Sequence, residues 1–144
     1  NKTSVGLWRV GPIDQPYGRY ARGFENSSER NRMYFDLDDN FLSTKPIGSI
    51  SLKIIYLDKG AGKFSVRYDS SSNPDKTAVT ITKTNSGNWV TKSIAIDDGA
   101  FANKGPRNSD FSLMNEDNDD DVDSANSSNN NQSSVDDTVF INES

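Results

Sequence analysis

The chain has 144 residues, of which 32% are hydrophobic, and this is enough for one core but not two, so residues 1–144 are predicted to form a single domain. It contains no cysteine and no histidine, which excludes disulfides, thiolate or imidazole metal sites and a Ser-His nucleophile pair. The formal net charge is -5, yet all 16 Lys and Arg lie in residues 1–110 beside 12 acids, without the basic stripe that a nucleic-acid partner would need.

Short runs with period-2 alternation and many β-branched or aromatic residues predict strands throughout the chain. The predicted strands are residues 5–10, 20–25, 32–38, 49–58, 63–70, 77–84, 89–96, 110–115 and 138–143. Turn signals rich in Gly, Pro, Asn and Asp separate them, and no segment shows a sustained helical period. The pattern predicts an all-β fold: an antiparallel two-sheet β-sandwich of about nine strands, of jelly-roll type.

The first two predicted strands carry aromatic and arginine side chains of the kind that contact sugars. Tyr and Trp rings stack on the apolar faces of sugar rings, and Arg binds carboxylates and sulfates bidentately. On this basis the predicted polysaccharide contacts in this part of the chain are Trp8, Arg9, Arg19, Tyr20 and Arg22. The alternative is that these arginines pair with carboxylates of the chain itself.

The stretch "RNRMYFDLDDNF" raises three interpretations of its acids. Asp36 and Asp38 point to the same side of a strand, about 7 Å apart, a spacing within the range that glycosidases use. They could instead bind calcium together with acids of other segments, here Asp97 and Asp110. A polar sheet face followed by an Asp-Asp-Asn turn is the third and favoured interpretation, because neighbours on one strand flank a groove poorly.

In the middle of the chain, residues 49–58 are apolar on both sides and predict a central strand. The glycine-rich residues 58–63, "DKGAGK", are predicted to form a hairpin loop to the next strand, because a phosphate-binding loop would need different spacing and a following helix.

Residues 116–137 form an acidic, low-complexity segment that is predicted to be an extended loop before the last strand. Its alternating aspartates resemble a calcium-binding loop, but Val122 stands where the turn glycine belongs and Ser128 where the bidentate glutamate belongs. A solvated acidic loop is therefore favoured.

Several motifs together resemble the β-sandwich accessory modules of bacterial polysaccharide-degrading enzymes: "MYFDLDDNF", "IIYLDKGAGKFSVRYDS" and "SGNWVTKSIAIDDGAFANKGPRNSDFSL". The resemblance spans roughly residues 5–114 and the last strand. It implies a non-catalytic carbohydrate-binding module of jelly-roll type, with a structural calcium, on an enzyme that acts on plant or algal polysaccharide. The acidic insertion departs from the pattern, and "SDFSL" lacks an arginine found in "ADFRI", for which Arg107 would have to substitute.

The sequence therefore predicts a module, not an enzyme, that binds polysaccharide and concentrates a tethered glycoside hydrolase or polysaccharide lyase on its substrate. The expected ligand is an anionic or algal glycan such as an agar-type galactan or alginate. Further predicted contacts are Asp69, Asn103 and Arg107. The alternatives are a small lyase using Tyr and Arg, a carboxylate hydrolase, or a structural sandwich that spaces domains.

The setting expected from the sequence is outside the cell. No apolar run approaches the length of about 18 residues that a membrane span needs, so a membrane partner is not expected. The chain also begins without a charged and then apolar leader, which favours a processed or excised module. We expect a secreted or cell-surface monomer.

Overall fold

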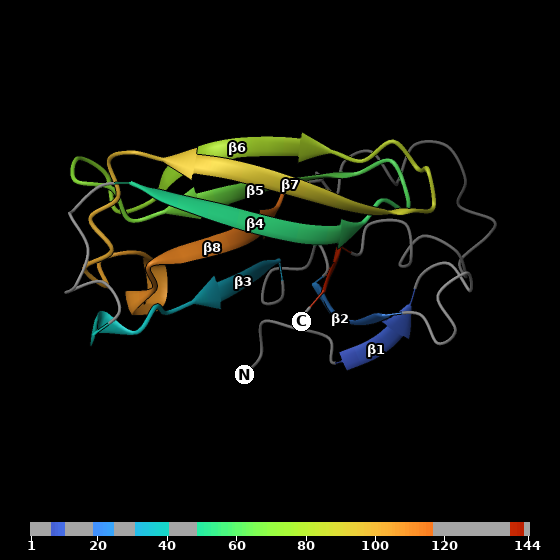
Figure 1. Ribbon diagram of the computed structural model, residues 1–144, viewed down its shortest axis with the longest axis horizontal. Coiled ribbons are helices and arrows are strands. Elements are labelled where there is room, and N and C mark those ends of the chain that lie inside the picture. Colours follow the sequence, from blue (N-terminus) through green and yellow to red (C-terminus); the bar gives the residue numbers. More distant parts are fainter. Residues whose placement is uncertain (1–6, 11–18, 25–30, 41–48, 117–138, 143–144) are drawn as a thin grey trace, which may run out of the picture.

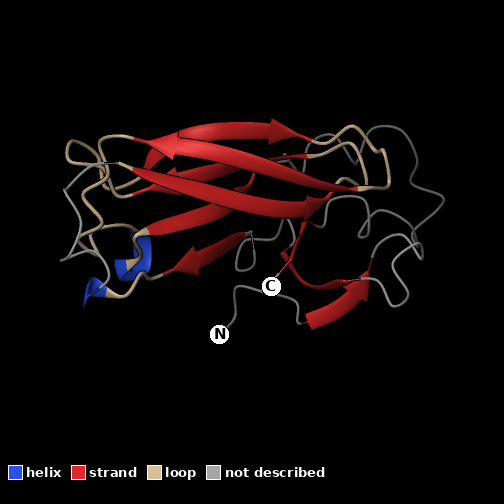
Figure 2. Ribbon diagram, viewed as in Figure 1, coloured by secondary structure: helices blue, strands red, loops and turns tan. Residues whose placement is uncertain are grey.

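The computed structural model describes residues 7–10, 19–24, 31–40, 49–116 and 139–142. The strands are β1 (Leu7–Val10), β2 (Arg19–Phe24), β3 (Arg32–Phe35), β4 (Ile50–Leu57), β5 (Lys63–Tyr68), β6 (Lys76–Thr82), β7 (Trp89–Ile96), β8 (Phe111–Asn115) and β9 (Val139–Asn142), and a short 3-10 turn, η1 (Pro106–Asn108), precedes β8. Strands dominate the described part of the chain (Figure 2). The predicted acidic loop at 116–137 lies outside it, except for Glu116.

The strands form antiparallel sheets, which confirms the predicted all-β class. One sheet has the order β1-β2-β9-β4-β7 and the other the order β3-β8-β5-β6 (Figure 1). The longest pairing joins β4 and β7 without interruption, from Ile50 opposite Ile96 to Leu57 opposite Trp89. No helix in the described ranges is both long and apolar enough to cross a bilayer.

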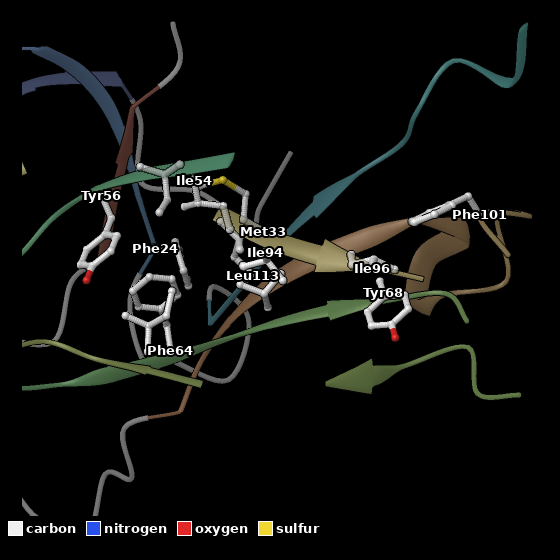
Figure 3. Packing of buried hydrophobic residues seen from close by; sticks show 13 residues of the cluster. Phe24, Met33, Ile54, Tyr56, Phe64, Tyr68, Ile94, Ile96, Phe101 and Leu113 are labelled. Atoms are coloured by element: carbon white, nitrogen blue, oxygen red, sulfur yellow. The ribbon is translucent and has the colours of Figure 1, made fainter. Parts of the chain in front are cut away.

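The two sheets share one hydrophobic core. Figure 3 shows its side chains, which come from strands of both sheets and include Ile54 and Ile94 on one side and Phe64 and Leu113 on the other. Aromatic contacts join the layers, since the rings of Tyr56 and Phe64 meet edge to face with their centroids 5.2 Å apart. Burial of these apolar side chains, each worth about 1.5–3 kcal/mol, supplies the main driving force for the fold.

Residues 58–63 do not form the predicted hairpin loop. β4 pairs with β7 and β9, whereas β5 pairs with β6 and β8, so this segment carries the chain from one sheet to the other. The reason lies at Asp58, whose backbone continues the pairing of β4. Its N–H donates to the carbonyl of Asn88, and its carbonyl accepts from the N–H of Gly87, both at 2.8 Å. The segment after β4 is therefore paired with the segment before β7. The chain does not turn back along β4 there, so β5 is not the hairpin partner of β4.

Candidate functional site

A connected polar network covers the outer side of the four-stranded sheet. In β3, Arg32 and Tyr34 alternate with the core residue Met33, so they lie on the side away from the core, and β5 and β8 show the same alternation. We call this surface the arginine face and define it by Arg32, Tyr34, Ser65, Arg67, Asp75, Arg107, Ser112 and Glu116.

Asp75 joins two arginines that come from strands not adjacent in the sheet. Arg32 lies on β3 and Arg67 on β5, with β8 between them. The Asp75 carboxylate pairs with the NH2 group of Arg32, and its Oδ2 accepts from the NH1 groups of Arg32 and Arg67, each at 3.3 Å. The Asp75 N–H in turn donates to Asn73 Oδ1 at 2.8 Å, which fixes the turn before β6. One carboxylate thus holds both guanidinium groups on the outer side of the sheet.

Glu116 completes the network at the other end of Arg67. Its Oε1 accepts from Arg67 NH2 at 3.0 Å and from the hydroxyl of Ser65. Arg67 Nε also donates to Ser65 Oγ at 3.1 Å, so each of the three guanidinium nitrogens of Arg67 has a hydrogen-bond partner. Ser65 is fully buried beneath these groups, which shows that the network is packed onto the sheet. Charge-assisted hydrogen bonds of this kind are geometrically specific and rigid.

Tyr34 lies between two cations. The guanidinium carbon of Arg32 is 5.6 Å from the centre of its ring, and that of Arg107 is 5.0 Å away, both within the range of a cation-π contact. Arg107 belongs to η1, which is closed by hydrogen bonds from the N–H of Gly105 to the carbonyl of Ser109 and from the N–H of Asn108 to the carbonyl of Gly105, both at 3.0 Å. The loop before β8 therefore places Arg107 over β3.

The face can bind but offers little for covalent catalysis. The side chains of Arg67, Asp75 and Glu116 are 24%, 31% and 24% exposed, so each presents some polar surface to solvent. By contrast, the hydroxyls of Ser65 and Ser112 lie beneath the arginines, and these residues are at most 1% exposed. A rigid set of forked donors and acceptors on a sheet is suited to recognising polar groups such as sugar hydroxyls and acids.

Five of the predicted contacts lie in the other sheet. Trp8, Arg9, Arg19 and Tyr20 belong to β1 and β2, where Arg9 pairs with Tyr20 across the two strands. Their side chains lie outside the described part, so their predicted role stays a prediction. Arg22 is opposite the core residue Ile141, and its Nε is buried. It thus lies on the core side of the sheet, where the residue as a whole is half-buried, and its predicted role stays a prediction.

Asp69 and Asn103, which were also predicted contacts, lie in a buried loop junction. Asp69 is 1% exposed, and its Oδ2 accepts from the N–H groups of Ala102 and Lys104, at 2.9 and 3.1 Å, on either side of Asn103. This burial removes Asp69 from the surface available to a polysaccharide. Among the predicted contacts whose side chains are described, Arg107 belongs to the arginine face, whereas Arg22, Asp69 and Asn103 lie elsewhere.

The four predicted metal ligands do not form one group: Asp36 and Asp38 are exposed in the segment after β3, and of these two only Asp36 is near Asp110. Asp110 is fully buried and holds two loops together, because its Oδ1 accepts from the N–H of Asn103 at 3.1 Å and its Oδ2 from the N–H of Leu37 at 2.8 Å. Asp97 follows β7 in the other sheet, is exposed, and accepts a bond of 3.4 Å from Ser49. Across the described ranges, no three acidic residues form a group that could hold a metal ion.

Burial affects the ionisation of Asp110. Its position in the interior raises the pKa of its carboxyl, against the hydrogen bonds from the Leu37 and Asn103 amides, and the nearby charges of Asp36 and Asp39 raise it further. Two other oxygens at this junction are buried without a hydrogen-bond donor in the described part of the chain: Oδ1 of Asp69 and Oδ1 of Asn103.

The residues that build the arginine face were mostly not singled out from the sequence. Alternation in "KFSVRYDS" predicts that Arg67 and Asp69 face outward; Arg67 does lie on the outer side of its strand, whereas Asp69 is buried. The partners of Arg67 lie outside that strand, because Glu116 is 49 positions and Asp75 is 8 positions from Arg67, and Asp75 is 43 positions from Arg32. Only the pairing of β3, β8 and β5 brings them together.

Fold and site together define an all-β chain with a rigid, mixed-charge face on one antiparallel sheet. No protein-family model matches the chain, and comparison with curated proteins and with solved structures finds no significant match.

Proposed function

We propose that the chain is a non-catalytic module that binds polysaccharide on its arginine face. The observation that carries this proposal is the network in which Asp75 and Glu116 hold Arg32 and Arg67 on the outer side of the sheet. Its charged groups are already ordered by their contacts with one another, so a glycan chain that binds there does not have to order them. An open sheet face also suits an extended polymer better than a small ligand, which needs a pocket.

The fold and the setting belong to the same proposal. The two sheets, with their shared core, support a β-sandwich of jelly-roll type with about nine strands, as the sequence motifs implied. In this proposal the module acts outside the cell, as a monomer, and is tethered to a glycoside hydrolase or polysaccharide lyase. Its contribution is to raise the local concentration of that enzyme on its substrate.

Affinity electrophoresis of the chain through gels containing neutral and acidic polysaccharides tests the binding. We expect at least one polymer to retard the protein, and Arg67→Ala to weaken that retardation at least tenfold. Lys53→Ala is the matched control, since Lys53 is an exposed cation on the outer side of β4 in the other sheet. No retardation by any polymer, or equal effects of the two variants, would contradict the proposal.

The contact between Tyr34, Arg32 and Arg107 favours a lyase as the second candidate, because such enzymes can use Tyr for proton transfer beside arginines. Incubating the chain with every polymer that it binds, and measuring unsaturated products and reducing ends, separates the two functions. The binding proposal expects neither product. Sustained release of either product would establish an enzyme instead.

We further propose that calcium binds at the loop junction around Asp69 and Asn103. The unpaired Oδ1 atoms of these residues are oxygen ligands of the type that calcium prefers. Comparing the melting temperature in calcium with that in EDTA tests this site. Calcium should raise the melting temperature by several degrees. Asp69→Asn should remove the rise, and an unchanged melting temperature in the parent chain would contradict the site.

A further inference from the structure

The charges of the arginine face do not balance. Arg32 and Arg67 are matched by two carboxylates: Asp75 pairs with both arginines, and Glu116 pairs with Arg67. Arg107 is a third cation on the same face, and its recorded contact is with the ring of Tyr34. In the described part of the chain, none of the ion pairs involves Arg107. One exposed positive charge is therefore left over beside a neutralised network.

The backbone that presents this charge adopts an unfavourable conformation. Arg107 and Asn108 have φ angles of 59° and 57°, in the left-handed region that side chains other than Gly and Asn rarely adopt. Asn tolerates this region, but an arginine there is strained, because its Cβ lies too close to the following carbonyl oxygen. The turn is held closed at Gly105, where a Cβ would lie 2.3 Å from the carbonyl oxygen of Ser109. Strain of this kind persists where the surrounding structure enforces it, and it is concentrated at binding sites.

The contact with Tyr34 places the Arg107 guanidinium on the face. Its carbon lies 5.0 Å from the centre of the Tyr34 ring, so the group is in cation-π contact instead of standing alone in solvent. A guanidinium arranged in this way binds a carboxylate or a sulfate through two parallel hydrogen bonds. A lysine or a free surface arginine would offer only a mobile charge.

We propose that Arg107 and Tyr34 form a subsite for the acidic group of the bound polysaccharide, a carboxylate or a sulfate ester, and that the ligand is therefore a polyanion. This inference rests on the proposed function, since it assigns the charged subsite of the same face. Arg107 holds the acidic group, Tyr34 supports the guanidinium, and the balanced network of Arg32, Arg67 and the two carboxylates contacts hydroxyls of the chain.

The test uses the whole chain and two matched pairs of polymers. One pair is alginate and its esterified, uncharged form, and the other is a sulfated galactan and its desulfated form. Affinity electrophoresis of the parent chain should show at least tenfold tighter binding to the charged member of one pair. The pair that shows the difference identifies the acidic group as carboxylate or sulfate.

Three variants assign the difference to Arg107. Arg107→Asn keeps a residue that tolerates the left-handed backbone, and it should lower the affinity for the charged polymer at least tenfold while leaving that for its uncharged form within twofold. Arg107→Lys, which keeps the charge without the fork, should fall between. Lys104→Gln removes an exposed cation from the same loop and should change either affinity by less than twofold.

The failures of the two proposals are distinguishable. Equal affinity for the charged and uncharged members of both pairs would overturn the acidic subsite and leave the polysaccharide-binding face standing. The same conclusion would follow if Arg107→Asn lowered the affinity for the charged polymer no more than Lys104→Gln does. If neither charged nor uncharged polymers retard the parent chain, both proposals fail. Circular dichroism and melting temperature confirm that each variant is folded.

Discussion

Asp58 shows how a single buried acid organises a loop in this protein. It is 3% exposed, and its carboxylate accepts hydrogen bonds from the N–H and the hydroxyl of Thr84, both at 2.6 Å, and from the N–H of Ser86 at 3.2 Å. Burial alone would raise the pKa of Asp58, but the hydrogen bonds from Ser86 and Thr84 outweigh it and hold the pKa well below its usual value. The charged form is therefore the one that the fold stabilises.

Replacing this carboxylate should destabilise the chain. We expect Asp58→Asn to lower the free energy of unfolding by about 2 kcal/mol at pH 7, because an amide cannot accept all three donors and leaves one unsatisfied. Asp97→Asn is the matched control, since Asp97 is exposed and accepts one long bond, and it should stay within about 0.5 kcal/mol. Urea unfolding of both variants measures the difference. Equal destabilisation would show that Asp58 does not hold the loop.

The same interaction predicts a pH dependence with a defined sign. The pKa of Asp58 is lower in the folded state than its unfolded value of about 3.9. The stabilisation from its carboxylate is therefore complete at pH values above about 3.9 and is progressively lost as the pH falls below about 3.9. The gap in unfolding free energy between the parent chain and Asp58→Asn should therefore shrink between pH 5 and pH 3. A gap that stayed constant over this range would contradict the lowered pKa.

Asp110 should titrate in the opposite direction. Burial raises the pKa of its carboxyl, so the folded state favours the protonated acid more than the unfolded chain does. Ionisation of Asp110 at neutral pH thus costs stability, and this cost disappears as the pH falls through its raised pKa. Carboxyl ¹³C shifts followed by NMR should give Asp58 a midpoint below, and Asp110 a midpoint above, the usual aspartate value. Midpoints in the reverse order would contradict both assignments.

Among the structural elements, the η1 turn connects stability to binding. Gly105 is required there because any Cβ would collide with the Ser109 carbonyl, at 2.3 Å. Its own φ is -63°, so the need for glycine is steric. The turn is further closed by the Ser109 hydroxyl, which donates to the carbonyl of Pro106 at 2.8 Å. A change at Gly105 must therefore open the turn and move Arg107.

Two glycine variants separate this role from a general backbone effect. Gly105→Ala should lower the free energy of unfolding by about 2 kcal/mol or more, as overpacked sites do, and should also weaken polysaccharide binding. Gly87→Ala should cost about 1 kcal/mol, because Gly87 has a φ of 74° with nothing within 4 Å of an added Cβ, and should leave binding unchanged. Thermal unfolding and affinity electrophoresis measure both effects. Normal binding by a folded Gly105→Ala variant would contradict the role of the turn.

At this scale, alternation in the sequence predicted the strands well but their ends less well. β7 was predicted with its observed bounds, residues 89–96, since eight alternating residues lie between clear turn signals. The strand predicted over 32–38 ends at Phe35, because Asp110 takes the N–H of Leu37 that would otherwise continue the ladder. Hydrogen bonds of this kind join segments that are distant in the sequence, so local strand propensity does not reveal them.

The candidate site was harder to predict than the strands for the same reason. Period-2 alternation gives the side of a strand on which a residue lies, and for Arg67 this was correct. Whether two outward-facing residues meet depends on which strands are neighbours in the sheet. The segment "DKGAGK" was predicted to be a hairpin, but it crosses between the two sheets, so the predicted neighbours were wrong. The network of Arg32, Arg67 and Asp75 depends on that strand order, so no short motif could indicate it.

For the whole molecule, two regions of the sequence carry net charges of opposite sign. Residues 1–110 carry 16 basic and 12 acidic residues, whereas residues 111–144 carry 9 acids and no base. The net charge of -5 repels an acidic polymer at long range, while Arg107 on the arginine face attracts it at contact. Salt screens exposed charges beyond about 10 Å at 0.1 M and beyond about 30 Å at 0.01 M. The repulsion therefore fades first as salt is added.

This balance predicts an unusual salt dependence of binding. Proteins that bind polyanions through many basic residues lose affinity steeply with salt, by the release of about one counterion per contact. Here one surplus arginine contacts the polymer and the rest of the molecule repels it, so affinity for the charged polymer should change less than about threefold between 20 and 200 mM NaCl. Titration calorimetry over this range measures it. A loss of a hundredfold or more would mean that several unpaired cations contact the polymer, and the balanced network of Arg32, Arg67, Asp75 and Glu116 would then have to open on binding.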